Sequence, residues 1–200
     1  MGRNARYALF RTNSEMFTVK SSLFPLFLLI FGLLPAALVR AECQIQLSDA
    51  QVAFSPVTRA ELLGYPGNSL ASVELSFGEP RSLDITVMCD RPAELALAFN
   101  GAAKDSESYL FGDNGRATLK LQAVSVDGQP VLIESDGKRE AEMNFTPGHI
   151  LRFWQNGTPV TGRTLRGSIT ASIWIPSPAS RVNERKSWEL SGAFVLGSAS

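Results

Sequence analysis

The sequence is poor in the side chains that most often carry catalysis. Its 200 residues include one histidine, His149, and two cysteines, Cys43 and Cys89. One histidine excludes metal sites built from several histidines and the zinc-protease helix motif, which needs two. We find no glycine-rich phosphate-binding loop. The chain is therefore predicted not to be an enzyme and to need no cofactor or metal.

Two catalytic alternatives remain open in the sequence. A Ser-His-Asp triad would have to use His149, whose place after Pro147-Gly148 is typical of an exposed structural histidine. A carboxylate pair for glycoside hydrolysis depends on spacing in three dimensions, which the sequence does not give. The acids concerned are better explained as solvated strand edges: Glu134, Asp136, Glu140 and Glu142.

Long apolar runs are absent except near the start of the chain. Leu23 to Val39 is almost entirely apolar, with Lys20 before it and the small-x-small pattern Val39-Arg40-Ala41 at its end. The run is short for a membrane span and contains proline and glycine, so residues 1–41 are predicted to be a secretory signal peptide. Translation starts at Met1 or at Met16, since residues 16–41 have conventional signal proportions.

The chain has no excess of charge of either sign. Removal of residues 1–41 takes five basic residues and one acidic residue from 19 of each, which leaves 14 basic and 18 acidic residues and a net charge of −4. Such a mixed, mildly acidic surface gives no electrostatic footprint for nucleic acid. No nucleic-acid partner is expected.

Two cysteines in an exported chain predict one disulfide, Cys43–Cys89, formed in an oxidising compartment. Cys43 is not a lipoprotein cysteine, because Glu42 stands where a small residue is required. The bond is expected to join the first strand to the third.

Alternation of apolar and polar residues is the pattern that fills the remaining chain. Leu83, Ile85 and Val87 alternate before Cys89, and Arg91-Pro92 is predicted to separate this strand from the next, 94–99. The same period recurs in 95–99, 117–126 and 165–175. Asp127-Gly128, Asp136-Gly137 and Asn156-Gly157, each between apolar runs, predict hairpins, and Asn100-Gly101 is predicted to be a turn. No stretch has a convincing helical period. We therefore predict an all-β, single-domain sandwich over residues 42–200.

The chain resembles the subunits of bacterial chaperone–usher fimbriae. The resemblance lies in the export signal, Cys43, Phe54 at the end of the first strand, Cys89 followed by Leu-Ala-Leu-Ala-Phe-Asn-Gly, and the Gly162–Ile175 stretch. It implies an immunoglobulin-like, pilin-type sandwich that lacks its last strand. A periplasmic chaperone, and later another fimbrial subunit delivered to the outer-membrane usher, would fill the gap by donating a strand.

The resemblance also implies a location and a set of contact residues. The protein would pass through the periplasm to the cell surface as part of a fimbrium. The groove for the chaperone or the next subunit would be bordered by the first strand, 45–54, and the last, 188–196. Its apolar residues would be Ile45, Leu47, Val52, Phe54, Trp188, Leu190, Phe194 and Leu196.

Two departures from the family pattern shape the expected role. Only Glu42 precedes Cys43 after the predicted cleavage, so no donor arm is expected, which suits a minor or tip subunit with adhesive function. The chain also continues past Trp174 by a further strand, so the sandwich could be self-complete. A host glycan or receptor is a possible partner. The alternative function is a self-contained, secreted β-sandwich module that binds a carbohydrate or another ligand, with Trp154 or Trp174 in a shallow site.

Overall fold

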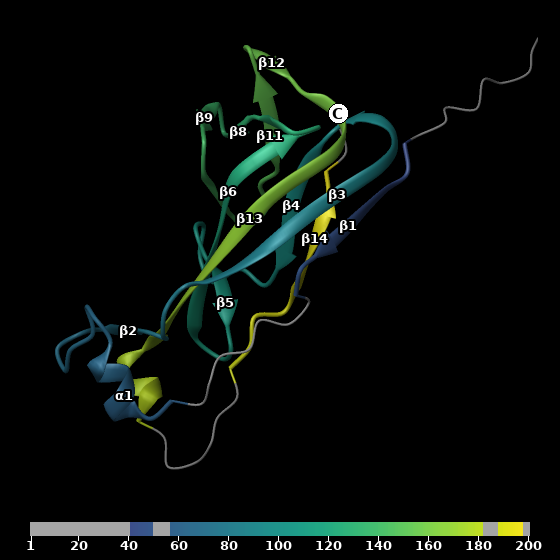
Figure 1. Ribbon diagram of the computed structural model, residues 1–200. Coiled ribbons are helices and arrows are strands. Elements are labelled where there is room, and N and C mark those ends of the chain that lie inside the picture. The colour runs from purple at the N-terminus through teal and green to yellow at the C-terminus, as the bar shows by residue number, and fades with distance from the viewer. Residues whose placement is uncertain (1–40, 50–56, 182–187, 198–200) are drawn as a thin grey trace, which may run out of the picture. The chain divides into compact units, whose positions relative to one another are not determined.

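The computed structural model describes residues 41–49, 57–181 and 188–197, all within one compact unit (Figure 1). Of the predicted signal peptide, only Ala41 belongs to these residues. Val52 and Phe54 of the predicted first strand also lie outside them. In the described part of the chain, no helix is long and apolar enough to cross a bilayer.

The described strands form two sheets in which every pairing is antiparallel, which confirms the predicted all-β class. The first sheet has the order β1-β3-β13-β6-β10, and β2, β5 and β7 pair at its margins. Its strands are β1 (Cys43–Leu47), β2 (Glu74–Ser76), β3 (Arg81–Glu94), β5 (Tyr109–Phe111), β6 (Gly115–Val126), β7 (Gln129–Pro130), β10 (Met143–Phe145) and β13 (Thr161–Pro176).

The second sheet has the order β14-β4-β11-β8-β9, with β12 paired to β11. Its strands are β4 (Ala96–Gly101), β8 (Leu132–Ser135), β9 (Lys138–Glu140), β11 (Leu151–Gln155), β12 (Thr158–Pro159) and β14 (Gly192–Leu196). Figure 1 shows the long strands β3 and β13 running side by side through the first sheet.

The main hydrophobic core lies between the two sheets. Leu83, Ile85 and Val87 of β3 are buried together with Leu97 of β4 and Phe153 of β11. Burial of every second residue follows from the two-residue repeat of a strand, in which successive side chains point to opposite faces. Each large apolar side chain buried in this way contributes roughly 1.5–3 kcal/mol.

A second apolar cluster lies where β13 and β6 extend beyond the main core. Leu75 of β2, Phe111 of β5 and Ile173 of β13 are buried in it with Leu62 of α1 (Arg59–Gly64). The short helix η1 (Ser177–Ser180) follows β13 and accepts hydrogen bonds from the Arg59 guanidinium.

Helix α1 is not predicted by the sequence, in which no stretch has a convincing helical period. It begins with a capping box: the Glu61 N–H donates to Thr58 Oγ1 (3.3 Å), and the Thr58 N–H donates to Glu61 Oε2 (2.6 Å). The backbone hydrogen bond from Thr58 lowers the pKa of Glu61 below its usual value. Thr-x-x-Glu was the available signal, but a six-residue helix is too short to show a helical period.

The predicted hairpin turns Asp127-Gly128, Asp136-Gly137 and Asn156-Gly157 are confirmed, whereas the turn predicted at Asn100-Gly101 is wrong, because both residues belong to β4. Asp127, Asp136 and Asn156 have φ values of 48°, 53° and 50°, and each is followed by a glycine with positive φ. These turns join β6 to β7, β8 to β9 and β11 to β12. Positive φ at both central residues matches the twist of the flanking strands, which explains the Asp-Gly and Asn-Gly pairs.

Two predicted strand boundaries are wrong. Strand β3 continues through Arg91-Pro92 to Glu94, and the break before β4 falls at Leu95. Residues 89–92 have no ladder partner on β13, so Pro92 removes no bond between these two strands. The last strand begins at Gly192, and Trp188 and Leu190 therefore precede it.

The disulfide is confirmed between Cys43 of β1 and Cys89 of β3. The two residues are directly opposite in the ladder, with Cα atoms 4.0 Å apart, and they are 46 residues apart in sequence. The bond therefore fixes the start of an outer strand to its only paired neighbour among the described strands.

Replacement of both cysteines, Cys43→Ser with Cys89→Ser, is expected to lower the free energy of unfolding by about 4 kcal/mol, because the unfolded chain gains the freedom of the open loop. Urea denaturation of the mature protein measures this change. Reduction should destabilise the natural protein to the same extent and leave the double variant unchanged. Equal stability of variant and natural protein contradicts the prediction.

Ala123 occupies a conformation that favours glycine. Its φ is 51°, and it lies where β6 carries an extra residue opposite β13, between the partners of Arg166 and Ser168. A β-bulge of this kind places one residue in the left-handed region, which costs an alanine about 1–2 kcal/mol.

Ala123→Gly is expected to stabilise the protein by up to about 1 kcal/mol, because relief of the left-handed strain exceeds the entropy that glycine loses on folding. Thermal unfolding should show a midpoint about 2–4 °C higher. The control is Ala193→Gly, at an exposed position of β14, which should destabilise. A lower midpoint for Ala123→Gly contradicts the prediction.

Candidate functional site

The candidate site is the open side of the sandwich, where the outer strands of the two sheets meet. Strand β1 pairs only with β3, and β14 pairs only with β4, among the described strands. Some Cα atoms of β1 and β14 lie within 8 Å of each other. Figure 1 shows the two strands running in opposite directions. We call Ile45, Leu47, Phe194 and Leu196 with their backbones the open edge.

The hydrogen bonds of β1 show which of its backbone groups face outward. The Asp90 N–H donates to the Glu42 carbonyl (3.0 Å), and the Ser48 N–H donates to the Asp84 carbonyl (2.9 Å). In an antiparallel ladder, bonded and non-bonded pairs alternate, so Gln44 and Gln46 also bond to β3. Cys43, Ile45 and Leu47 therefore turn their backbone N–H and C=O groups away from β3.

The backbone groups of β14 alternate in the same way. The Gly197 N–H donates to the Ala96 carbonyl (2.9 Å), directly across the ladder. Counting back by two, Val195 and Ala193 bond to β4. Phe194 and Leu196 therefore direct their backbone groups to the open side.

The residues with outward backbone groups are also the apolar ones. Ile45, Leu47, Phe194 and Leu196 are partly buried against the main core. The Phe194 ring lies 4.9 Å from that of Phe99 and 5.3 Å from that of Phe145, measured between centroids. Each strand thus offers donors and acceptors that no other described strand pairs with, beside apolar side chains that are not fully covered.

Trp188 and Leu190 hold the segment that leads into β14. The Trp188 ring stacks on Phe111 of the second cluster, with centroids 6.1 Å apart. The Gly112 N–H donates to the Glu189 carbonyl (2.8 Å). Leu190 packs against both clusters. The two residues predicted to border the groove therefore anchor β14 from outside the strand.

Gly112 is required where the anchoring segment crosses the end of β5. Its φ is 57°, and a Cβ atom there would lie 2.5 Å from the Trp188 ring. A surface pocket at the same place belongs to this anchor and is lined by Ala102, Leu110, Gly112, Asp113, Glu189 and Ser191.

The two tryptophans predicted to bind a ligand lie on different sheets. Phe153 and Ile173 are buried, so their neighbours Trp154 on β11 and Trp174 on β13 point to the outer faces. These outer faces lie on opposite sides of the sandwich, so Trp154 and Trp174 do not line one site. Each indole is covered by a guanidinium: Arg139 lies 3.5 Å from the Trp154 ring centroid, and Arg116 lies 4.0 Å from that of Trp174.

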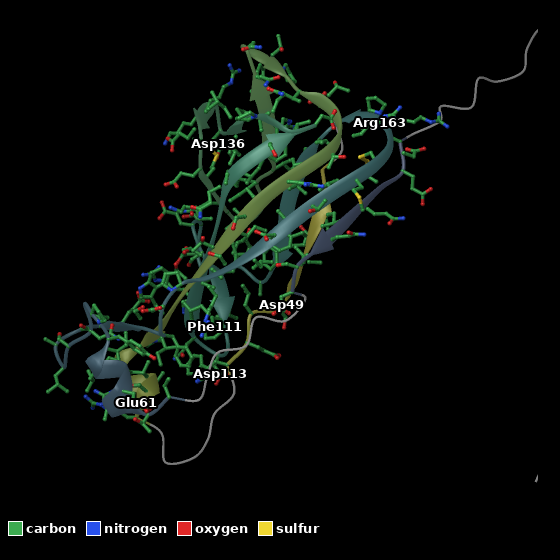
Figure 2. The ribbon with its side chains drawn as sticks, viewed as in Figure 1. Asp49, Glu61, Phe111, Asp113, Asp136 and Arg163 are labelled. Atoms are coloured by element: carbon green, nitrogen blue, oxygen red, sulfur yellow. A yellow bond between two sulfur atoms is a disulfide. The ribbon has the colours of Figure 1, made fainter. Side chains whose placement is uncertain are left out.

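His149 is exposed and bonded to a carboxylate. Its Nδ1 lies 2.7 Å from Oδ2 of Asp136, the β8–β9 turn residue labelled in Figure 2. The Ser135 hydroxyl donates to the same carboxylate (3.5 Å) and not to the imidazole. These three residues therefore do not form the Ser-His-Asp order of contacts. In the described ranges, no three His, Cys, Asp or Glu side chains are grouped as a metal site.

Comparison of the chain with protein-family models, curated proteins and solved structures finds no match.

Tyr109 lies beneath the open edge and links the stability of this region to pH. Its side chain is fully buried, its hydroxyl donates to the Phe99 carbonyl (3.2 Å), and its ring packs edge-on against Phe99 at 4.8 Å. Burial raises the pKa of Tyr109 to about 12 from 10. The folded state therefore favours the protonated hydroxyl.

The stabilisation from neutral Tyr109 is expected to be complete below pH 10 and to disappear as pH rises from 10 to 12. The free energy of unfolding should fall by about 2 kcal/mol. Two pH units at about 1.4 kcal/mol each set the upper limit, and local relaxation of the folded protein reduces the change. Urea unfolding of natural protein and Tyr109→Phe at pH 9 and pH 11.5 measures it. Tyr109→Phe should show a smaller decrease; equal decreases contradict the prediction.

Proposed function

We propose that the protein is a fimbrial-like structural subunit that accepts a strand from another protein at the open edge. One observation carries the proposal: outer strands of two different sheets lie close together, and the backbone groups of their apolar residues have no strand partner among the described residues. Edge strands with free donors and acceptors are templates for β-strand addition.

One inserted strand could pair on both sides once β1 and β14 separate slightly, because it needs about 9.5 Å between them, and some of their Cα atoms lie within 8 Å of each other. Ile45 and Leu47 offer backbone groups from β1, and Phe194 and Leu196 offer them from β14. Because β1 and β14 run in opposite directions (Figure 1), the inserted strand is parallel to one and antiparallel to the other. Its alternate side chains would cover the partly exposed apolar residues.

The fold type, the partners and the location that we propose are those that the resemblance to fimbrial subunits implies. The sandwich is then of the immunoglobulin-like, pilin type, with the disulfide within one sheet and the final strand missing. A periplasmic chaperone donates the strand first, and a neighbouring subunit replaces it at the outer-membrane usher. The protein is exported by its signal peptide and reaches the cell surface, in a minor or tip position with an adhesive role.

Residue-resolved amide hydrogen exchange tests strand acceptance. A strand of alternating valine and threonine is fused after Ser200 through a Gly/Ser linker. Exchange at Ile45, Leu47, Phe194 and Leu196 is expected to slow by at least about tenfold, equal to about 1.4 kcal/mol of local protection. Val195, already bonded to β4, serves as an internal reference. Unchanged exchange at the four open-edge amides contradicts the proposal.

A pair of variants at adjacent positions of β1 supplies the control. Ile45→Asp in the fusion places a charge among the apolar side chains of the open edge and should abolish the protection. Gln46→Asp lies on the opposite, exposed face of the same strand and should retain it. Circular dichroism of both variants confirms that the sheets are formed.

A further inference from the structure

The two Arg–Trp stacks differ in one respect that points to a ligand. Arg116, above Trp174, is paired through Nε with Glu74 Oε2 at 2.8 Å. Arg139, above Trp154, forms no ion pair with any residue that the structure describes. One stack is therefore electrically satisfied, whereas the other presents an unpaired guanidinium to solvent.

The surroundings of Arg139 form a defined patch on the outer face of the second sheet. Glu134 of β8 stands directly between Arg139 of β9 and Arg152 of β11 in the ladder. Two residues after Arg152 on β11, Trp154 stands between Leu132 of β8 and Pro159 of β12. We call Leu132, Arg139, Arg152 and Trp154 the Arg–Trp patch; it lies beside the β8–β9 turn that Asp136 marks in Figure 2.

The charges of the patch favour an anion. Arg152, like Arg139, forms no ion pair with another described residue. The one carboxylate between them, Glu134, is directed to its own turn, where Oε1 accepts from the Gly137 N–H (2.9 Å). Two guanidinium groups on one face are thus left with a single carboxylate that is already hydrogen-bonded.

The patch also has an apolar side and an unused donor. Leu132 is 45% exposed although it lies on a sheet face beside an indole. The Trp154 Nε1 atom is buried and has no hydrogen-bond partner among the described residues. A buried donor without a partner costs about 1–3 kcal/mol, so a ligand that displaces the side chains covering this atom and places an oxygen beside it would be stabilising.

We propose that the Arg–Trp patch binds a small ring compound that carries a carboxylate, such as an acidic monosaccharide. The carboxylate pairs with the planar fork of Arg139, a geometry that guanidinium matches with two parallel hydrogen bonds. The ring covers Leu132, and Arg152 adds long-range attraction. This site is independent of the open edge, so each proposal can fail without the other.

The indole N–H signals in a ¹⁵N NMR spectrum of the mature protein test the site. The chain has three tryptophans, so three signals are expected, and Trp154→Phe assigns one. Glucuronate is expected to move the Trp154 signal saturably with a roughly millimolar dissociation constant, and glucose at equal concentration to leave it unmoved. Benzoate is a ring carboxylate without a sugar. If benzoate moves the Trp154 signal and glucuronate does not, the ligand is an aromatic carboxylate.

Variants of the two stacks complete the test. Arg139→Gln keeps a planar polar group over the indole and should weaken binding at least about tenfold, the effect of losing one charged pair. Arg139→Lys should lose less, and Arg116→Gln, at the matched stack, should bind normally. The proposal is overturned if neither carboxylate moves the Trp154 signal, if glucose moves it equally, or if folded Arg139→Gln binds as the natural protein does.

Discussion

The structure depends on the requirement that backbone N–H and C=O groups find partners wherever water is excluded. Two antiparallel sheets meet this requirement for most of the described chain, and the exceptions lie at outer strands. On β1 and β14 the same two-residue alternation that turns Ile45, Leu47, Phe194 and Leu196 toward the core turns their backbone groups away from the neighbouring strand. Among the described residues, the apolar side chains of β1 and β14 thus belong to the residues whose backbone groups have no strand partner.

Several features hold the two outer strands in place despite their single ladders. The disulfide fixes the first residue of β1 to β3. At the other side, Trp188 and the Gly112–Glu189 hydrogen bond fix the residues before β14 to the second cluster. Aromatic packing of Phe194 with Phe99 and Phe145 holds the strand itself. The open edge is therefore a preorganised surface, which lowers the entropy lost when a partner strand binds.

The two outer faces of the sandwich differ in how their charges are satisfied. On the first sheet, Glu74 neutralises Arg116 above Trp174, and Glu142 pairs with Lys120 at 3.0 Å. On the second sheet, Arg139 and Arg152 lack such partners among the described residues. Similar residue types therefore give a closed structural stack in one place and an anion-binding patch in another, because the register of the neighbouring strands places the carboxylates differently.

The sequence by itself determined the β class, the disulfide and three of the turns, because alternation, cysteine count and Asp-Gly or Asn-Gly pairs act over short distances. It missed α1, whose capping box spans four residues, and it extended the last strand over Trp188 and Leu190, whose apolar character does not reveal which cluster they join. Only the tertiary structure decided that Trp154 and Trp174 lie on opposite sheets and that β1 lies beside β14. Those relations depend on strand order and register, which arise from contacts between residues far apart in the chain.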